Sequence, residues 1–334
     1  AISTLCFTIP PSSAIWSRAV AEWTAKMARK RRGKPIHGWI VVDKPAGISS
    51  SAAVSCVRRY TGAAKAGHGG PLDPAATGVL PVALGEATKT VSYAMDGTKT
   101  YHFVLRWGEA TTSDDSAGEV TEQSERRPTE REIIDVLDVF TGDIDQVPPI
   151  YSAIKVGGRR AYELARADQD VTLAPRTVRI ERIGLEGLHD ADHAAFVVVA
   201  GKGAYMRSLG RDIARRLGTV GHLSELRRTS VGPFTENQAI SLDKLETLGH
   251  SAPDSGVLLP IETVLADIPA LALTGQEARK LKHGQAIPVL PIASRSLLKN
   301  VNQGDTVCAV AGGKLVALAT IKGGEVRPLR VMNL

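Results

Sequence analysis

One acidic side chain stands out because of the chain around it. Asp73 lies in the run GHGGPLDP at residues 67–74, where glycines permit backbone angles closed to other residues and two prolines restrict the chain. The apolar residues 77–84 that follow predict a buried segment, so Asp73 stands at the edge of a core. A carboxylate there can be reached by a substrate and can act as a nucleophile or take up a proton. For an arbitrary Leu-Asp-Pro, a structural turn is the more common explanation.

The residues around Asp73 belong to a longer pattern. From Gly67 to Lys89 the chain reads G-H-x-G-x-L-D-P-x-A-x-G-x-L and then G-x-A-T-K, which resembles the signature of the TruB family of bacterial tRNA pseudouridine synthases. Three further blocks occur in the order typical of the family, at residues 37–50, 146–155 and 202–207. The resemblance extends from residue 36 to about residue 230.

Two positions in the Asp73 loop depart from the family pattern. Pro71 stands where the family usually has Thr or Ala, and Gly69 replaces a residue that is commonly Thr. Proline removes a backbone N–H and biases Gly70 toward extended angles. If that amide normally holds the loop or an RNA phosphate, we expect reduced activity even with Asp73 intact.

The resemblance implies a reaction and a partner. Family members turn uridine into pseudouridine in the T loop of tRNA, at position 55. The C1′–N1 glycosidic bond breaks, uracil rotates, and the base is rejoined through C5, with no cofactor. The target lies inside a folded arm, so the enzyme must flip the nucleotide out of its stack. The expected partner is therefore the T arm of a tRNA.

The resemblance also assigns site residues. Asp73 is the expected catalytic carboxylate, Arg207 the cation that keeps it ionised, and Tyr205 the side chain that handles the C5 proton. Four more residues are expected to bind substrate or to support the loop: Tyr101 stacking on uracil, Leu226 lining the pocket, His68 replacing the extruded nucleotides, and Lys44 beneath the loop. Without the resemblance, either tyrosine could be core packing and a lone histidine would more often be structural.

The sequence leaves two other functions open. A nucleosidase or ribosyltransferase could use Asp73 on a glycosidic carbon, but it would release free base. A non-catalytic RNA-binding or tRNA-folding protein of the same fold would also fit the basic clusters and the Pro71 departure. The joint presence of Asp73, Arg207 and Tyr205 favours catalysis, because binding alone does not require these three residues.

The charge of the chain favours a nucleic-acid partner. Lys and Arg number 41 against 35 Asp and Glu, which gives a net charge of +6 in 334 residues. Basic residues cluster at 29–34, 58–59, 159–160, 211–216 and 227–228. Any one cluster could be an ordinary solvated face, but together they predict a surface that follows phosphates. Aromatic residues are only 4% of the chain, too few for long rows of stacking rings.

The cysteines and histidines indicate neither disulfides nor metal. Cys6, Cys56 and Cys308 are odd in number and far apart. The run HDADH at residues 189–193 offers metal ligands, but its place between two strand-like segments predicts a polar hairpin turn. No run approaches the roughly 18 apolar residues of a membrane span. We therefore expect a cytoplasmic monomer that binds no metal and no membrane.

Local patterns predict the elements that position the site. Residues 39–42 predict a buried strand, and the alternation in 101–107 predicts a half-buried strand with Tyr101 on its apolar face. Residues 129–132 have capping-box spacing, which predicts a helix of about three turns that ends at Gly142. Residues 194–200 predict a strand that leads through a loop to a second helix, which Gly218 ends. Residues 226–228 are expected on a connection.

Strands and helices alternate irregularly, which favours an α+β mixed-sheet fold, and the resemblance identifies it as the pseudouridine synthase fold. We expect a basic N-terminal extension at 1–33, a non-core segment rather than a transit peptide, and a catalytic domain at 34–262 whose last 21 residues form a bridge. Short strands predicted at 305–311, 314–321 and 326–331 indicate a small β-rich domain at 263–334, in a place that resembles the PUA-like RNA-binding domain of the family.

Overall fold

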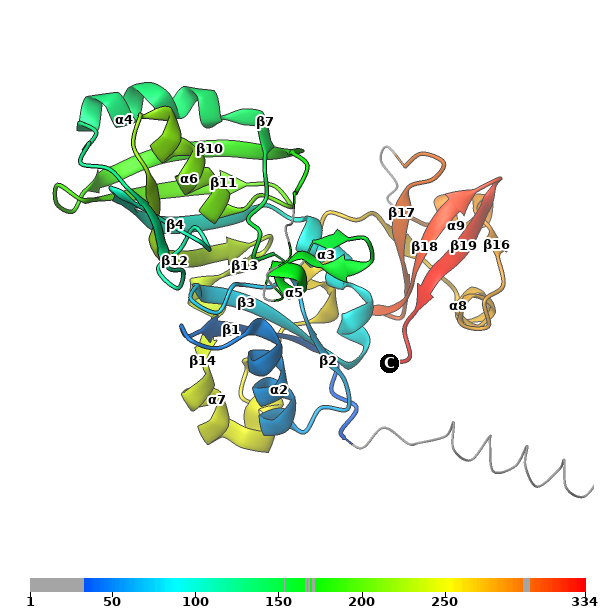
Figure 1. The fold of residues 1–334 in the computed structure, drawn as a ribbon. Helices are drawn as coiled ribbons and strands as arrows, with labels where there is room; N and C mark the ends of the chain where they lie inside the picture. Colours follow the sequence, from blue (N-terminus) through cyan, green and yellow to red (C-terminus); the bar gives the residue numbers. More distant parts are fainter. Residues whose placement is uncertain (1–32, 153, 166, 168, 170–171, 297–300) are drawn as a thin grey trace, which may run out of the picture.

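The computed structural model describes residues 33–334 except 153, 166, 168, 170–171 and 297–300. The predicted basic extension thus lies outside the described residues apart from Gly33. Two sheets organise the chain, one of ten strands and one of five (Figure 1).

The ten-stranded sheet runs through most of the chain. Its strand order is β14 (Ile240–Ser241), β1 (Gly38–Lys44), β3 (Thr77–Leu84), β12 (Gly221–Val231), β4 (Lys99–Trp107), β11 (His193–Ala200), β10 (Arg176–Leu188) and β7 (Gly142–Gln146), with β2 (Ala66–His68) beside β3 and β13 (Phe234–Thr235) beside β12. The pairs β1–β14 and β3–β12 are parallel and the others are antiparallel, so the sheet is mixed, as predicted.

Alternate side chains of β1 point into two apolar layers, one on each face of the sheet. Ile40 and Val42 pack on one face with helices α2 (Ser50–Thr61) and α7 (Leu242–Leu248), which lie together below β1 in Figure 1. Trp39 and Val41 face the opposite layer. A strand buried on both faces reads as a continuous apolar run, which is why residues 39–42 were recognisable in the sequence.

The other half of the sheet packs on α6 (Met206–Arg216) and α4 (Glu130–Leu137). The capping box predicted at Thr129 is present, but the α-helix ends at Leu137 and a short 3-10 turn, Asp138–Phe140, replaces its predicted third turn. Ile134, an apolar residue of this helix, is nevertheless 52% exposed. A helix of two turns buries only the residues on its core-facing stripe, and Ile133 and Leu137 already occupy that stripe.

Two further predictions need correction. Residues 226–228 form part of strand β12 and not a connection. The segment 242–262 is more than a bridge, because it contains α7, whose buried Leu245 packs into the same layer as α2. Both errors come from tertiary context, since a strand interrupted by charged residues and a short helix carry weak local signals.

The five-stranded sheet occupies the C-terminal region. Its order is β15 (Ala270–Ala272), β17 (Thr306–Ala311), β18 (Lys314–Lys322), β19 (Glu325–Val331) and β16 (Ile287–Pro288), and α8 (Gly275–Lys282) packs on it. The three predicted strands are present. The sheet docks on the large one through a shared apolar cluster that includes Trp39, Phe234 and Leu318, and Lys89 Nζ donates to the Val331 carbonyl at 2.6 Å.

The remaining elements are short. They are η1 (Gly85–Lys89), α3 (Val91–Asp96), β5 (Glu109–Thr111), β6 (Val120–Gln123), β8 (Lys155–Val156), β9 (Arg159–Arg160), α5 (Ala161–Ala165), η3 (Glu236–Gln238), η4 (Gly249–Asp254), η5 (Ile261–Leu265) and α9 (Leu290–Ala293). Among the helices described, none has the length and apolar character needed to cross a membrane.

Candidate active site

The loop that carries Asp73 joins β2 to β3 and is held through its backbone. Ser50 Oγ accepts a hydrogen bond from the Leu72 amide at 2.7 Å and donates to the Leu72 carbonyl at 2.9 Å. Lys44 Nζ donates to the carbonyl of Pro74 at 3.1 Å. Because these bonds fix the residues on either side, the Asp73 side chain is left to project outward, with 38% of it exposed.

Lys44 lies completely buried beneath this loop. Its Nζ also donates to the carbonyls of Pro45 at 2.8 Å and Ile48 at 2.9 Å, so a single ammonium group joins the end of β1 to the Asp73 loop. Burial lowers the pKa of Lys44 to about 8, although the negative charge of Asp73 acts in the opposite direction. Because Lys44 is buried, we assign it the role of supporting the loop.

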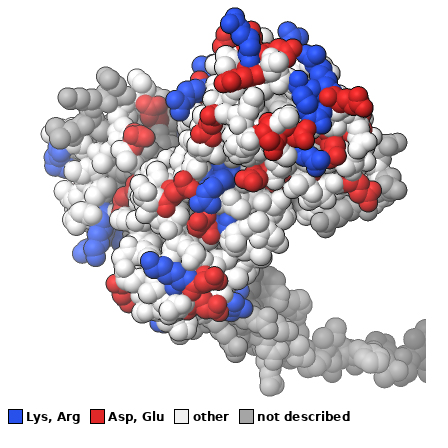
Figure 2. All heavy atoms as spheres, turned by 90° about the vertical axis from the view of Figure 1, so that its left-hand side faces the viewer, with Lys and Arg blue, Asp and Glu red and all other residues white. Residues whose placement is uncertain are grey.

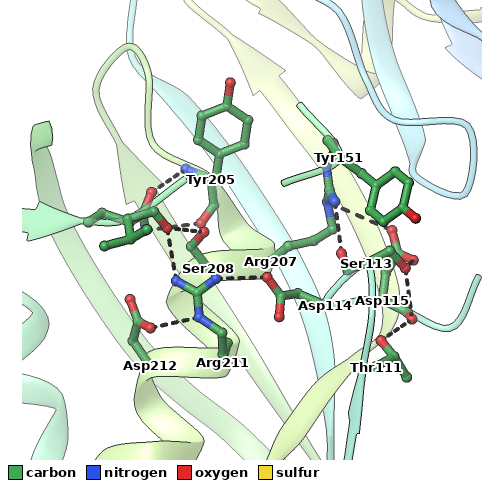
Figure 3. Close-up of polar contacts among 12 residues, drawn as sticks. Thr111, Ser113, Asp114, Asp115, Tyr151, Tyr205, Arg207, Ser208, Arg211 and Asp212 are labelled. Atoms are coloured by element: carbon green, nitrogen blue, oxygen red, sulfur yellow. Dashed lines mark hydrogen bonds and ion pairs between the residues drawn. The ribbon is translucent and has the colours of Figure 1, made fainter. Parts of the chain in front are cut away.

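Arg207 is the second residue of α6 and so lies in the first turn of that helix. Its Nε donates to Asp73 Oδ2 at 2.9 Å, across 134 residues of sequence. The two remaining nitrogens donate to the carbonyls of Ser113 at 2.8 Å and Tyr151 at 2.9 Å (Figure 3). With only 4% of its side chain exposed, the guanidinium is fixed in place and presents its charge to the carboxylate.

A second carboxylate near Arg207 was missed in the sequence. Asp115 Oδ2 lies 3.7 Å from Arg207 Nε, and the Asp115 side chain is 14% exposed. The Thr111 hydroxyl donates to the Asp115 carbonyl at 2.7 Å, and Arg211 binds the adjacent Asp114 at 2.9 Å (Figure 3). The run TTSDDS at 111–116 is typical of turns built by Ser, Thr and Asp, but it gives no local sign that the turn reaches α6.

A small pocket opens between the two acidic loops and β12. It is lined by Asp73, Ala75, Ala76, Asp115, Ser116, Arg207, Leu223, Ser224, Glu225 and Leu226. The sequence-predicted residues Asp73, Arg207 and Leu226 therefore meet at one cavity, which has three carboxylates, one fixed cation and an apolar wall.

The two predicted tyrosines lie on different elements, and neither is among the residues that line this pocket. Tyr205 precedes α6, and the Gln146 side chain holds its backbone with bonds of 2.8 and 3.1 Å. Burial raises the pKa of the Tyr205 phenol, and the charge of Asp73 raises it further. Tyr101 lies on β4, partly buried against the core that contains Phe103 and Phe196.

His68 is not part of the Asp73 pocket. It lines a separate hollow with residues from α2 and from the η1 region, on the side of the loop where β2 ends: Ser51, Val54, Lys65, Ala66, Gly67, Thr88 and Val91. Its Nδ1 atom is buried without a hydrogen-bond partner in the described part of the chain, and burial lowers the pKa of the ring. The His68 imidazole is therefore not among the side chains that line the Asp73 pocket.

The run 189–193 forms the predicted hairpin turn between β10 and β11. His193 Nδ1 lies 2.8 Å from Asp190 Oδ1. Within the residues that the structure describes, no group of His, Cys, Asp and Glu side chains is arranged to hold a metal ion.

The predicted phosphate-tracking surface needs revision at two clusters. Arg228 is only 2% exposed and so does not face a phosphate backbone, and Arg227 is paired with Asp43 at 3.0 Å and with Glu236. Arg211 is likewise paired with Asp114 and Asp212. Figure 2 shows both signs of charge interspersed on the face it displays. Exposed arginines do remain on α2.

The comparisons with known proteins agree with this arrangement. The family model described as TruB family pseudouridylate synthase (N terminal domain) matches residues 58–206, and the tRNA pseudouridylate synthase B C-terminal domain matches residues 207–266. A curated tRNA pseudouridine synthase B from Rhodospirillum rubrum is 58% identical over 92% of this chain and 100% of its own length. One from Gluconacetobacter diazotrophicus is 51% identical over 91% of this chain and 100% of its own.

Solved structures show the same fold. The chain resembles one in a crystal structure of a Cbf5-Nop10-Gar1 complex, with a TM-score of 0.68, 29% identity and coverage of 88% of this chain and 84% of that one. Another likeness, with a TM-score of 0.67 and 25% identity over 91% and 90% of the two chains, is to an H/ACA RNP bound to a substrate RNA containing 2′-deoxyuridine. The chain belongs to the TruB family of pseudouridylate synthases.

Proposed function

We propose that this protein isomerises uridine to pseudouridine at position 55, in the T arm of tRNA. The observation that carries the proposal is the ion pair between Arg207 Nε and Asp73 Oδ2, 2.9 Å long, at the wall of a pocket. The names of the curated relatives supply the reaction and the class of substrate. A protein that only bound or folded RNA would not need a carboxylate fixed in this way.

Asp73 supplies the chemistry in this proposal. Its carboxylate either attacks C1′ of the ribose or removes a proton from C2′, while uracil departs with the electron pair of the C1′–N1 bond. The freed base rotates, C5 forms the new bond to C1′, and Asp73 returns to its starting state. The adjacent Arg207 charge favours the ionised carboxylate that either route requires.

The surrounding residues orient the base. Tyr101 stacks on the uracil, a contact worth about 1 to 3 kcal/mol, and Leu226 packs against it from β12. The raised pKa of Tyr205 keeps its phenol neutral, and a neutral phenol is a weak base. Tyr205 therefore takes up the C5 proton only as its own hydroxyl proton passes to an acceptor, for which the nearby Asp73 carboxylate is suited. Transfer of that proton to N1 of the product then restores both side chains to their starting states.

The hollow at His68 receives the RNA in this proposal. It adjoins Ser51 and Val54 of α2, and the exposed Arg58 continues the same face of that helix toward solvent. The imidazole would occupy the space left by the flipped nucleotides, while the arginine contacts phosphate.

We expect the two departures from the family pattern to be compatible with full activity. The loop is anchored through the Leu72 amide and the carbonyls of Gly70 and Pro71, so the N–H that proline lacks is not one of its anchors. A Cβ atom at Gly69 would lie 3.1 Å from the Trp39 ring, so this chain packs a tryptophan where a side chain would be crowded.

Incubation of the purified protein with an unmodified T-arm hairpin, followed by nucleoside analysis, tests the function. We expect pseudouridine to form in one-to-one correspondence with lost uridine, and no free uracil. A hairpin with cytidine at the target position is the matched control. Released uracil would indicate a nucleosidase, and RNA binding without conversion would indicate a non-catalytic protein.

A further inference from the structure

We infer that Arg228 is a positioning residue, which holds the Asp73 loop and the Tyr101 side chain in fixed relation to each other. This inference rests on the proposed function. In the sequence Arg228 belonged to a basic pair expected to contact phosphates, but the structure places it inside the molecule, with 2% of the residue exposed. A guanidinium at that depth cannot follow an RNA backbone.

All three guanidinium nitrogens of Arg228 donate hydrogen bonds to backbone carbonyls. Its Nε donates to Val79 at 2.9 Å, one terminal nitrogen to Gly70 at 2.9 Å, and the other to Pro71 at 3.2 Å. Gly70 and Pro71 are the residues that lead into Leu72 and Asp73. Arg228 thereby links the residues before Asp73 to Val79 in β3. Lys44 binds the loop on the other side of Asp73, at the Pro74 carbonyl.

The same side chain reaches Tyr101. Arg228 and Tyr101 are direct cross-strand partners between β12 and β4, so their side chains lie on the same face of the sheet. Interaction with the Tyr101 side chain raises the pKa of the Arg228 guanidinium, against the larger lowering by burial. The positive charge of Arg228 also contributes to lowering the pKa of Lys44 and that of His68. One buried cation thus contacts Tyr101 and acts electrostatically on Lys44, His68 and Asp73, all of which the proposed function places at the site.

The β3 strand is shaped to bring this arginine close. Gly78 pairs with Arg228 across the parallel β3–β12 contact and adopts a φ of +99°. A Cβ atom at Gly78 would lie 2.2 Å from the Arg228 carbonyl oxygen. Gly78, the second residue of β3, therefore permits the close approach that lets one arginine span loop and sheet.

A lysine at position 228 could not make all of these contacts. Its ammonium is a single point charge, whereas the planar fork reaches three carbonyls and a tyrosine at once. We expect Arg228→Lys to lower the single-turnover rate at saturating T-arm hairpin at least tenfold, since misplacement of reacting groups by about 1 Å can cost about a hundredfold. Hairpin affinity should stay within about twofold, because Arg228 does not face solvent.

The test measures rate, affinity and thermal unfolding for Arg228→Lys and Arg228→Met, with Arg227→Lys as a matched control that removes the neighbouring arginine on the opposite face. Tyr101→Phe alone is expected to cost about threefold, and adding it to Arg228→Lys should cost less than twofold more, because both changes disrupt one arrangement. Rates above a tenth of the wild-type value in folded Arg228→Lys, or full additivity with Tyr101→Phe, would overturn the inference. Failure of the wild type to form pseudouridine would instead refute the proposed function.

Discussion

The two sheets of this molecule differ in whether polar and charged side chains are buried in them. In the described part of the chain, every buried polar or charged side chain precedes residue 229 and so belongs to the large sheet or to elements packed on it. The core of the five-stranded sheet is built from apolar residues such as Leu271, Leu281 and Val307. Lys44, Arg207 and Arg228, by contrast, are cations buried in the large sheet.

The difference shows where the molecule tolerates unfavourable burial. Removing a cation from water costs several kcal/mol unless hydrogen bonds replace its hydration. Three of the four cations buried in the described part of the chain donate to backbone carbonyls at the site, and one of these three, Arg207, also binds Asp73. The fourth, Lys99, donates to the carbonyl of Met95. The large sheet thus accepts costly groups that fix a reactive loop, whereas the described core of the small sheet is apolar.

The largest effect we expect is at Arg207. Arg207→Met removes the cation beside Asp73 and leaves the carbonyls of Ser113 and Tyr151 without their donor. The single-turnover rate should fall at least about a hundredfold. Arg179→Met, which removes an exposed arginine paired with Asp143, is a suitable control. A rate near wild type would show that the ion pair is dispensable and would remove the contrast between the sheets.

Tyr101→Ala is expected to have the next effect. Loss of about 1 to 3 kcal/mol of stacking corresponds to a rate about 5 to 150 times lower at limiting RNA. Tyr101→Phe retains the ring and should recover most of that loss. Equal activity of the alanine variant and the wild type would mean that Tyr101 only packs against the core and does not stack on the substrate.

Lys44 should make stability depend on pH. Its folded pKa of about 8 lies below the ordinary 10.5, so between these values the unfolded chain binds more protons and stability rises with pH. The unfolding free energy of the wild type, minus that of Lys44→Met, should increase by about 2 kcal/mol from pH 7.5 to 9.5. Denaturant titrations at both pH values measure it, and a constant or falling difference would mean that Lys44 is not buried as a charge.

The smallest effect on rate is expected from the small sheet. Leu281 is fully buried in its apolar core, so Leu281→Ala should cost about 2 to 5 kcal/mol of stability. The single-turnover rate at saturating RNA, measured below the unfolding transition, should stay within about twofold. A large loss of rate in the folded variant would show that packing in the small sheet also positions the reacting groups.

Much of the fold could be predicted because its signals are local. The Thr129 capping box, the alternation in β4 and the apolar run of β1 each specify their element within a few residues. The pairing of Asp73 with Arg207, by contrast, joins residues 134 positions apart, and only the family resemblance indicated it.

Arg228 and Asp115 mark what the sequence could not predict. An arginine next to another arginine is usually on the surface, and nothing nearby shows that loop carbonyls from residues 70 and 71 surround this one. Asp115 sits in a turn with ordinary turn composition. Its contact with Arg207 depends on how that turn folds over α6.

The most direct test of the account compares Asp73→Asn with Asp115→Asn, because both carboxylates lie near Arg207 and line the same pocket. Single-turnover conversion and affinity should be measured on the unmodified T-arm hairpin. We predict that Asp73→Asn forms no detectable pseudouridine while affinity stays nearly unchanged, and that Asp115→Asn is slower but still active. Substantial conversion by Asp73→Asn would contradict the central claim that Asp73 performs the reaction.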